Sequence, residues 1–270
     1  TAYEISTPVS WARRCVSETA GFSGWQTQRD GRGVQDALER ALSRVADRPI
    51  AVTAAGRTDA GVHATAQVVH FDTAVERPER AWTLGVNTYL PPDVAVRWLR
   101  AAPEGFHARF SARSRSYQYC ILNGPLRSAL LRDRVWWVRR PLDVDAMALA
   151  ASHLRGEHDF SAFRAAECQA GTATREIRRL TVRRDGPWLR IDVTANAFLH
   201  HMVRNIVGTL AVVGRGDAEP DWVAGVLAGR DRRAAGMTAP AAGLYLVHVG
   251  YGEALDQPPS LRPLALETAT

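Results

Sequence analysis

The sequence predicts an α+β fold built from two similar subdomains. Both halves of the chain are rich in strand-like runs, and each half also carries segments whose apolar residues recur at helical spacing. The chain has 270 residues, 46% of them hydrophobic and 23% charged, which is typical of a globular protein with a sizeable core. We predict an N-terminal subdomain over residues 1–110, a C-terminal subdomain over 111–252 and an extended, proline-containing tail over 253–270.

In the first half, Val34, Leu38, Leu42 and Val45 recur at helical spacing and predict an amphipathic helix over 34–46. Apolar and alternating runs predict strands on both sides of a glycine-rich loop and again before residue 102. These strands are expected at 50–55, 66–72 and 94–101.

In the second half, Asp143 is expected to cap a helix that ends near residue 154. A long helix is expected over 197–213 and a shorter one over 220–228. On the long helix, His201, Arg204 and Gly208 fall opposite an apolar stripe, and the glycine permits close approach of a second surface. Strands are expected at 116–122, 134–138, 176–184, 187–194 and 244–250.

The charge of the chain favours an anionic partner. The net charge is +6, and all 34 basic residues are arginine. Arginine binds phosphates with two parallel hydrogen bonds and stacks on bases, so RNA is a suitable partner.

The cysteines and histidines predict no metal site. Cys15, Cys120 and Cys168 lack the spacing of a metal or disulfide framework and are interpreted as buried apolar residues. His200 and His201 would point about 100° apart on a helix, and no metal site is expected. No targeting or membrane-spanning segment is visible, which favours the cytoplasm.

The most informative motif is the loop Gly56-Arg57-Thr58-Asp59-Ala60-Gly61-Val62-His63-Ala64 between two predicted strands. Loops held between strands commonly present reacting groups, and glycine allows sharp turns. Asp59 is therefore the candidate nucleophile, with Arg57 as its cationic partner. By spacing alone, an Asp in such a turn more often bonds its own backbone.

This loop resembles the catalytic loop of the tRNA pseudouridine synthase A (TruA) family. Further segments agree in order, so the resemblance extends from about residue 21 to 251. They are Gly24-Trp25-Gln26-Thr27-Gln28, Phe106-His107-Ala108-Arg109-Phe110-Ser111-Ala112, Tyr117-Gln118-Tyr119, residues 196–208 and residues 238–246.

The resemblance implies the pseudouridine synthase fold, in which two similar α/β subdomains with antiparallel sheets join around a central catalytic cleft. It implies an isomerase that converts uridine to pseudouridine at positions 38, 39 and 40 of the tRNA anticodon stem-loop. The partner is tRNA, the assembly is a homodimer, and no cofactor is needed because the reaction involves no redox or phosphoryl chemistry.

The resemblance also assigns roles to residues. Asp59 is the catalytic carboxylate, and Arg57 or Arg204 keeps it ionised. Tyr117 stacks on the uracil and removes the C5 proton, although a tyrosine with a pKa near 10 is a poor base at neutral pH. In the substrate-binding group, Leu244 forms an apolar wall of the pocket. His107 and Arg109 contact the RNA backbone. Each of these residues also has an ordinary structural interpretation. Tyr117 could be a half-buried aromatic residue, Arg204 a solvated arginine and Leu244 a core residue. The segment with His107 and Arg109 could be a strand edge.

Residues 1–20 depart from the family, which begins with an alternating strand that ends in a Tyr-Asp-Gly element. Arg13-Arg14 and Ser17-Glu18 would place charge and polarity in a strand that should be buried. Two other functions are less compatible with the sequence. A noncatalytic RNA-binding module would be expected to lose Asp59, and a dehalogenase-like hydrolase would need a second Asp where Gly61 stands.

Overall fold

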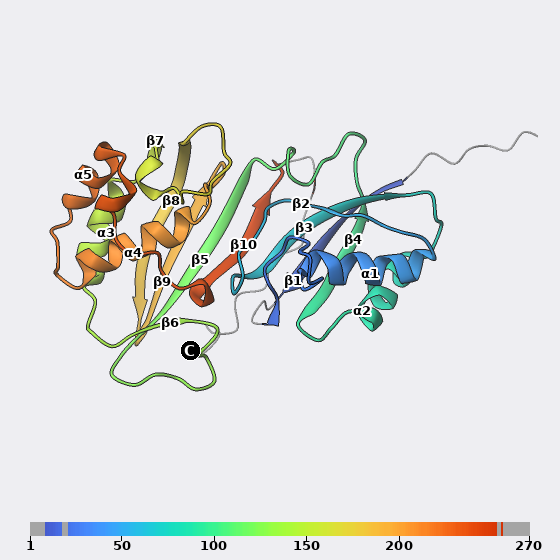
Figure 1. Cartoon of the computed structure of the whole chain (residues 1–270), viewed down its shortest axis with the longest axis horizontal. Coiled ribbons are helices and arrows are strands. Elements are labelled where there is room, and N and C mark those ends of the chain that lie inside the picture. Colours follow the sequence, from blue (N-terminus) through green and yellow to red (C-terminus); the bar gives the residue numbers. More distant parts are fainter. Residues whose placement is uncertain (1–8, 18–20, 253–254, 256–270) are drawn as a thin grey trace, which may run out of the picture. The chain divides into compact units, whose positions relative to one another are not determined.

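The structure is a computed structural model that describes residues 9–17, 21–252 and 255, without the side chains of 9–17. These residues form two compact units (Figure 1). The first unit contains the chain up to Arg113 and the segment from Leu246 onward, and the second contains Ser114–Tyr245. The predicted C-terminal subdomain contained the whole last strand. In the structure most of that strand, from Leu246 onward, belongs to the first unit.

The sheet of the first unit has the strand order β4-β1-β3-β10. β1 (Val9–Ser17) is antiparallel to both β3 (His63–Thr73) and β4 (Val94–Ala101), and β2 (Thr53–Ala54) pairs with β3. β10 spans Leu244–Gly250. The strand that the N-terminal residues left in doubt therefore forms, with a register shift toward its end where it meets β3.

Helices complete the core of the first unit. α1 (Val34–Ala46) has the predicted bounds, because its apolar positions recur regularly and its first turn is capped by the Asp36 carboxylate, which accepts from Gly33 N–H at 2.9 Å. A π-helical turn (Ala81–Gly85) continues into α2 (Val86–Tyr89), which the sequence analysis did not predict. The main apolar contacts join these helices to the sheet through Leu38, Phe71 and Trp82.

In the second unit, β5 (Ser114–Asn123), β9 (Trp188–Ala195), β8 (Thr174–Asp185) and β7 (Gly156–Asp159) follow one another as antiparallel neighbours. β6 (Trp136–Val138) is instead parallel to β5. The sheet is therefore mainly antiparallel, as an α+β fold requires, with one short parallel pair.

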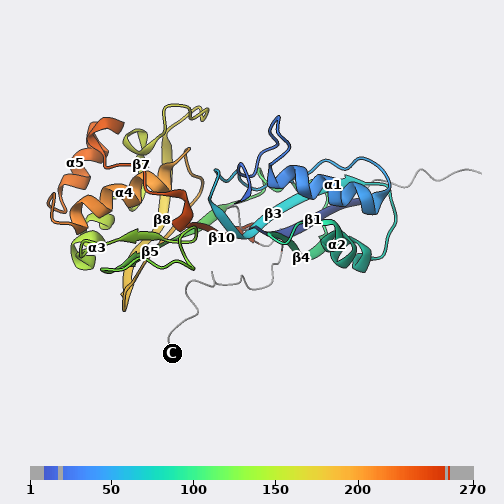
Figure 2. The same cartoon turned by 60° about the horizontal axis from the view of Figure 1, so that its bottom comes forward.

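Three helices, α3 (Val144–Ser152), α4 (Met202–Gly214) and α5 (Trp222–Gly229), gather in the second unit (Figures 1 and 2). Asp143 caps α3 as predicted, accepting from Ala146 N–H at 2.9 Å. Short 3₁₀ turns lie at Ser161–Phe163, Arg232–Ala234 and Ala241–Gly243. No helix among the described residues is long and apolar enough to cross a membrane.

The start of α4 was predicted five residues too early, at residue 197. His201 adopts the left-handed conformation (φ 60°), and this stops a helix from extending through it. The backbone before it is bonded elsewhere: Ala165 N–H donates to His200 O, and His200 N–H donates to Cys168 Sγ. Contacts with distant residues thus override the helical spacing of apolar residues in this segment.

Candidate functional site

In the first unit, the Asp59 loop connects β2 to β3. Asp59 is half-buried and Arg57 is exposed, while Thr58 between them is buried. The loop closes in a turn in which Val62 N–H donates to Asp59 O at 3.1 Å, and Gly61 takes the positive φ of 75° that such turns favour. At its start, the buried Gln67 side chain donates to Gly56 O at 2.7 Å. The start of the loop is therefore fixed to β3, and its other end is closed by a turn of its own.

A second segment, Gly24-Trp25-Gln26, supports the same loop, and we call it the strap. Trp25 N–H donates to Thr58 O at 2.9 Å. A Cβ atom on Gly24 would lie only 2.8 Å from Thr58 O and 3.0 Å from Ala60 N, and Gly24 has a φ of 98°. Only glycine fits this close approach without strain. The Trp25 side chain is buried in the core, which anchors the strap from the other side.

The strap is bonded in turn to the N-terminus of α1. Val34 N–H donates to Gly24 O and Gln35 N–H donates to Trp25 O, at 3.1 and 3.0 Å. These donors are among the N–H groups that a helix leaves without partners in its first turn. Main-chain hydrogen bonds thus run from α1 through the strap to the residue next to Asp59.

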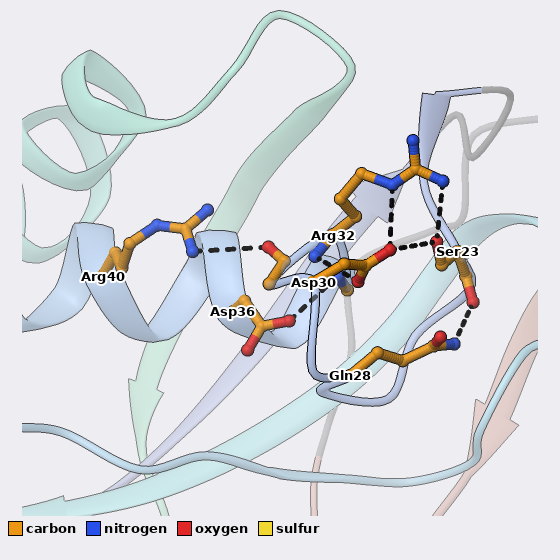
Figure 3. Close-up of polar contacts among 8 residues, drawn as sticks. Ser23, Gln28, Asp30, Arg32, Asp36 and Arg40 are labelled. Atoms are coloured by element: carbon orange, nitrogen blue, oxygen red, sulfur yellow. Dashed lines mark hydrogen bonds and ion pairs between the residues drawn. The ribbon is translucent and has the colours of Figure 1, made fainter.

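The loop that joins the strap to α1 is ordered by its own polar contacts (Figure 3). Arg32 Nε donates to Asp30 at 3.1 Å, and Gln28 Nε2 donates to Ser23 O at 2.7 Å. Ser23 N–H donates to Arg32 O at 3.0 Å. Exposed ion pairs add little stability individually, so the value of this network is to fix the shape of the loop.

His107 and Arg109 lie in a tight turn of the first unit over residues 107–111, which we call the His107 turn. The strand edge considered in the sequence analysis is wrong for this segment. Arg109 N–H and Phe110 N–H both donate to His107 Nδ1 at 3.1 Å, so this imidazole closes the turn on itself. A second imidazole, His70 on β3, accepts from Ala108 N–H at 3.1 Å.

His70 must be neutral at Nδ1 to accept that hydrogen bond. Its pKa is lowered, first because burial disfavours the charged imidazolium and second because of the nearby charge of His107. The negative charge of Asp72 raises the pKa of His70 but does not outweigh these two effects. The acceptor on which the His107 turn depends is therefore available at neutral pH.

In the second unit, Tyr117 lies on β5 opposite Val193 of β9 and is half-buried. Its ring meets Phe198 at right angles, with the ring centroids 5.1 Å apart. This T-shaped contact is a favoured aromatic geometry and restrains the plane of the Tyr117 ring. The tyrosine is thus partly buried, as expected both for a residue that stacks on a base and for an ordinary aromatic residue of a strand.

Arg204 lies in the first turn of α4 and is fixed by the segment 236–244, which we call the C-terminal crossing. Arg204 Nε donates to Ala239 O at 2.8 Å, while Ala239 N–H donates to Arg204 O at 3.1 Å. The interpretation of Arg204 as a purely solvated residue is wrong, since its side chain is half-buried and bonded to the backbone.

The same crossing packs against Tyr119 and leads into Leu244. Tyr119 is fully buried and donates from its hydroxyl to Pro240 O at 2.7 Å. Burial raises its pKa well above the usual value, and the charge of Arg204 opposes this shift. A Cβ on Gly243 would lie 2.7 Å from the Tyr119 ring. Leu244, next in the chain, is buried, as both a pocket wall and a core residue would be.

Gly208 permits the close approach that the sequence predicted. A Cβ there would lie 1.7 Å from Met237 O, so the backbone of the crossing rests directly on α4. By contrast, the expected separation of His200 and His201 is wrong. Because both precede the helix, their rings lie against each other with centroids 3.9 Å apart.

The cysteines follow the sequence interpretation only in part. Cys120 is buried, and burial raises the pKa of its thiol strongly. Cys168 is only half-buried and accepts the hydrogen bond from His200 already described. The side chain of Cys15 lies outside the described residues.

The predicted site residues are thus divided between the units. The first unit holds Arg57, Asp59, His107 and Arg109, and the second holds Tyr117, Arg204 and Leu244. Sequence reasoning gave no role to Gly24, Tyr119, Phe198 and Phe110, although all four lie inside the segments that carry the family resemblance. Their positions within those segments were the available signal.

Comparison with known proteins gives a consistent result. The profile of the tRNA pseudouridine synthase family matches residues 19–111 and 150–252. The tRNA pseudouridine synthase A of Burkholderia vietnamiensis is 54% identical over 241 residues, 89% of each chain. That of Hydrogenovibrio crunogenus is 55% identical over 237 residues, 88% of this chain and 90% of the relative. That of Escherichia fergusonii is 52% identical over 246 residues, 91% of each. A solved Cbf5-Nop10-Gar1 complex aligns with 88% of this chain and 49% of its own, at 11% identity and a TM-score of 0.36.

Proposed function

Because this chain belongs to the tRNA pseudouridine synthase family, we propose that it converts uridine to pseudouridine at positions 38, 39 and 40 of the tRNA anticodon stem-loop. As a tRNA pseudouridine synthase it is an isomerase. The bond from N1 to C1′ breaks, the bond from C5 to C1′ forms, and the proton on C5 is replaced by one on N1. Atoms and electrons balance within the substrate, so the reaction consumes no co-reactant.

The observation that carries the mechanism is the fixed position of Asp59. Its loop is bonded to β3 through Gly56 and to the strap through Thr58, and its own carbonyl closes the turn. A carboxylate that attacks or stabilises a reacting sugar carbon must be held in place, because a small displacement lowers the rate strongly. We assign Asp59 this role, with Arg57 or Arg204 as its cationic partner.

The second unit supplies the groups that we assign to the uracil. Tyr117 stacks on the base, supported by its restrained ring plane beside Phe198. Leu244 forms an apolar wall that keeps water from the detached uracil. Arg204 is suited to electrostatic work because two hydrogen bonds tie it to Ala239.

The assembly and cellular location are also part of the proposal. Leu126 and Leu130, in the connection between β5 and β6, are 80% and 88% exposed, which is unusual for two large apolar side chains in one loop. We assign this loop to self-association in a homodimer, which sedimentation equilibrium can measure. We propose that the enzyme acts in the cytoplasm, because its proposed substrate, tRNA, is found there.

Asp59→Asn tests the function most directly. The amide keeps the shape of the side chain and removes only the reacting charge, so pseudouridine formation should be abolished while tRNA affinity stays within a few-fold. The assay is pseudouridine mapping in tRNA treated with wild type or variant, and wild-type activity should survive EDTA because the proposed reaction uses no metal. Turnover by Asp59→Asn would show that the carboxylate is not the reacting group.

Tyr117→Phe separates the two roles of the tyrosine, since it keeps the stacking face and removes the hydroxyl. If the hydroxyl accepts the C5 proton, the single-turnover rate falls by roughly 10² to 10⁴, as is typical of general-base loss. An unchanged rate assigns Tyr117 to stacking alone. Measuring tRNA affinity alongside distinguishes either result from lost binding.

A further inference from the structure

Phe110 is a large aromatic side chain left in water. It is 75% exposed, and it lies at the tip of the His107 turn in the first unit. A single exposed apolar residue is common and means little by itself. What distinguishes Phe110 is how firmly the residues around it are held.

The backbone of the turn has a partner for each N–H group from residue 107 to 111. His107 N–H donates to Ser111 Oγ at 3.0 Å, and Ser111 N–H donates to His107 O at 2.9 Å. The three N–H groups between them donate to His70 and His107, as described above. The turn is therefore ordered before any ligand arrives, which lowers the entropy lost on binding.

The ring of Phe110 is the outermost member of a row of aromatic rings. It stacks on His107 with centroids 4.2 Å apart and planes inclined by 30°. His107 lies 4.8 Å from His70, and His70 lies 6.2 Å from the buried ring of Phe106. The row thus connects an exposed ring to the core and fixes its orientation.

Positive charge accompanies this ring. The guanidinium carbon of Arg109 lies 5.6 Å from the centroid of Phe110, within the range of a cation–π contact. Arg113 follows within the same unit and is also exposed. An exposed aromatic ring beside an arginine is the combination that binds unpaired nucleotides, with the ring under a base and the cation near a phosphate.

We propose that Phe110 is a stacking platform for an unpaired base of the tRNA, with Arg109 binding a neighbouring phosphate. The proposal rests on tRNA being the substrate, and it adds a contact to the groups assigned to the reacting uridine. The base must be unpaired, because the faces of a base inside a helix are covered by its neighbours. The net charge of +6 favours RNA over an uncharged partner.

The test compares Phe110→Ala, Phe110→Leu and Phe110→Tyr, with Leu84→Ala as a control that shortens another exposed apolar side chain of the same unit. Base stacking of the usual strength predicts tRNA affinity at least roughly 10-fold weaker for the Ala and Leu variants. Phe110→Tyr and the control should bind like wild type. If the ring acts in binding, the loss in Phe110→Ala and Phe110→Leu should be much larger in tRNA affinity than in the single-turnover rate at saturating tRNA.

A second comparison identifies what the ring contacts. The loss in Phe110→Ala should appear with an anticodon stem-loop and disappear with a fully paired duplex of equal length. Salt dependence separates ring from cation: Phe110→Ala should leave the slope of log affinity against log salt unchanged, whereas Arg109→Gln should reduce it by about one phosphate contact.

Three results would overturn the proposal. They are wild-type affinity in Phe110→Ala, wild-type affinity in Phe110→Leu, and a shift of the Phe110→Ala protein toward monomer, which would make a second copy of the chain the occupant. Failure of the proposed function is distinguishable, because wild-type protein would then form no pseudouridine in tRNA.

Discussion

The Asp59 loop and the His107 turn, both in the first unit, are held by different chemistry. Main-chain hydrogen bonds, a close glycine contact and the Gln67 side chain fix the residues around Asp59. The His107 turn depends on two imidazole nitrogens as acceptors. The hydrogen bonds described for the Asp59 loop join uncharged groups, whereas the bond from Ala108 N–H is lost when His70 is protonated. The His107 turn should therefore respond to pH more than these hydrogen bonds do.

The largest effect should follow from Gly24→Ala, which breaks the support of the Asp59 loop. The new Cβ would meet Thr58 O at 2.8 Å in a backbone conformation that side chains rarely adopt. Strain of this kind costs about 1–3 kcal/mol, and displacement of a reacting group by about 1 Å can lower the rate about 10²-fold. We expect the single-turnover rate to fall far more than tRNA affinity.

Gly85→Ala is the matched control, because a Cβ on that helical glycine makes only an ordinary contact, 3.6 Å from Val45. Urea unfolding of both variants shows whether they remain folded. A folded Gly24→Ala protein with the wild-type rate would mean that the strap does not position Asp59.

Raising the salt concentration should weaken tRNA binding moderately and leave the catalytic rate almost unchanged, which distinguishes the His107 turn from the Asp59 loop. If arginines such as Arg109 bind tRNA phosphates, log affinity should fall linearly with log salt, by about 0.7 to 0.9 per phosphate contact. The rate at saturating tRNA should change little, because the hydrogen bonds described for the Asp59 loop join uncharged groups, which salt screens little. Filter binding and single-turnover assays over the same salt series measure both. A flat binding curve would show that the arginine excess is only a solvated surface.

The smallest effect should come from pH. The folded protein lowers the pKa of His70, so the unfolded chain binds more protons as the pH falls below the ordinary histidine value of about 6.5. This contribution to stability is complete above that value and is lost as the pH falls through the folded-state pKa. Urea unfolding from pH 8 to 5 should therefore show a steeper decline for wild type than for His70→Gln, which keeps an acceptor for Ala108 N–H and does not titrate. Equal declines would contradict this role of His70.

Helices and strands could be predicted from the sequence where the local spacing of apolar residues determines them. The bounds of α1 and β4 match because the spacing of their apolar residues agrees with the face that they bury. The π-helical turn and α2 were missed because each has a single buried residue, Trp82 and Val86, which is too few to define a period. The start of α4 was wrong because Ala165 and Cys168, more than thirty residues away, bond its leading segment.

The candidate site residues were found through family resemblance rather than periodicity. The residues that hold them in place were not predicted. The motif around Asp59 can be recognised in the chain, but the need for glycine at Gly24 arises only when the strap meets Thr58. Likewise the His107 turn requires His70, a residue 38 positions from Ala108. Supports that join distant segments leave no local pattern, so the sequence names the reacting groups more readily than what holds them.

The contact between α4 and the C-terminal crossing has a consequence for hydrogen exchange. The crossing contains no strand before residue 244, yet Gly236 N–H donates to the buried Thr209 Oγ1 at 3.0 Å and Ala239 N–H donates to Arg204 O. Gly236 and Ala239 are both buried against α4, so these amides should exchange with deuterium mainly when the helix itself opens. A segment that looks like a loop should therefore have the slow exchange of the core, and the environment of Arg204 should persist for as long as the second unit stays folded.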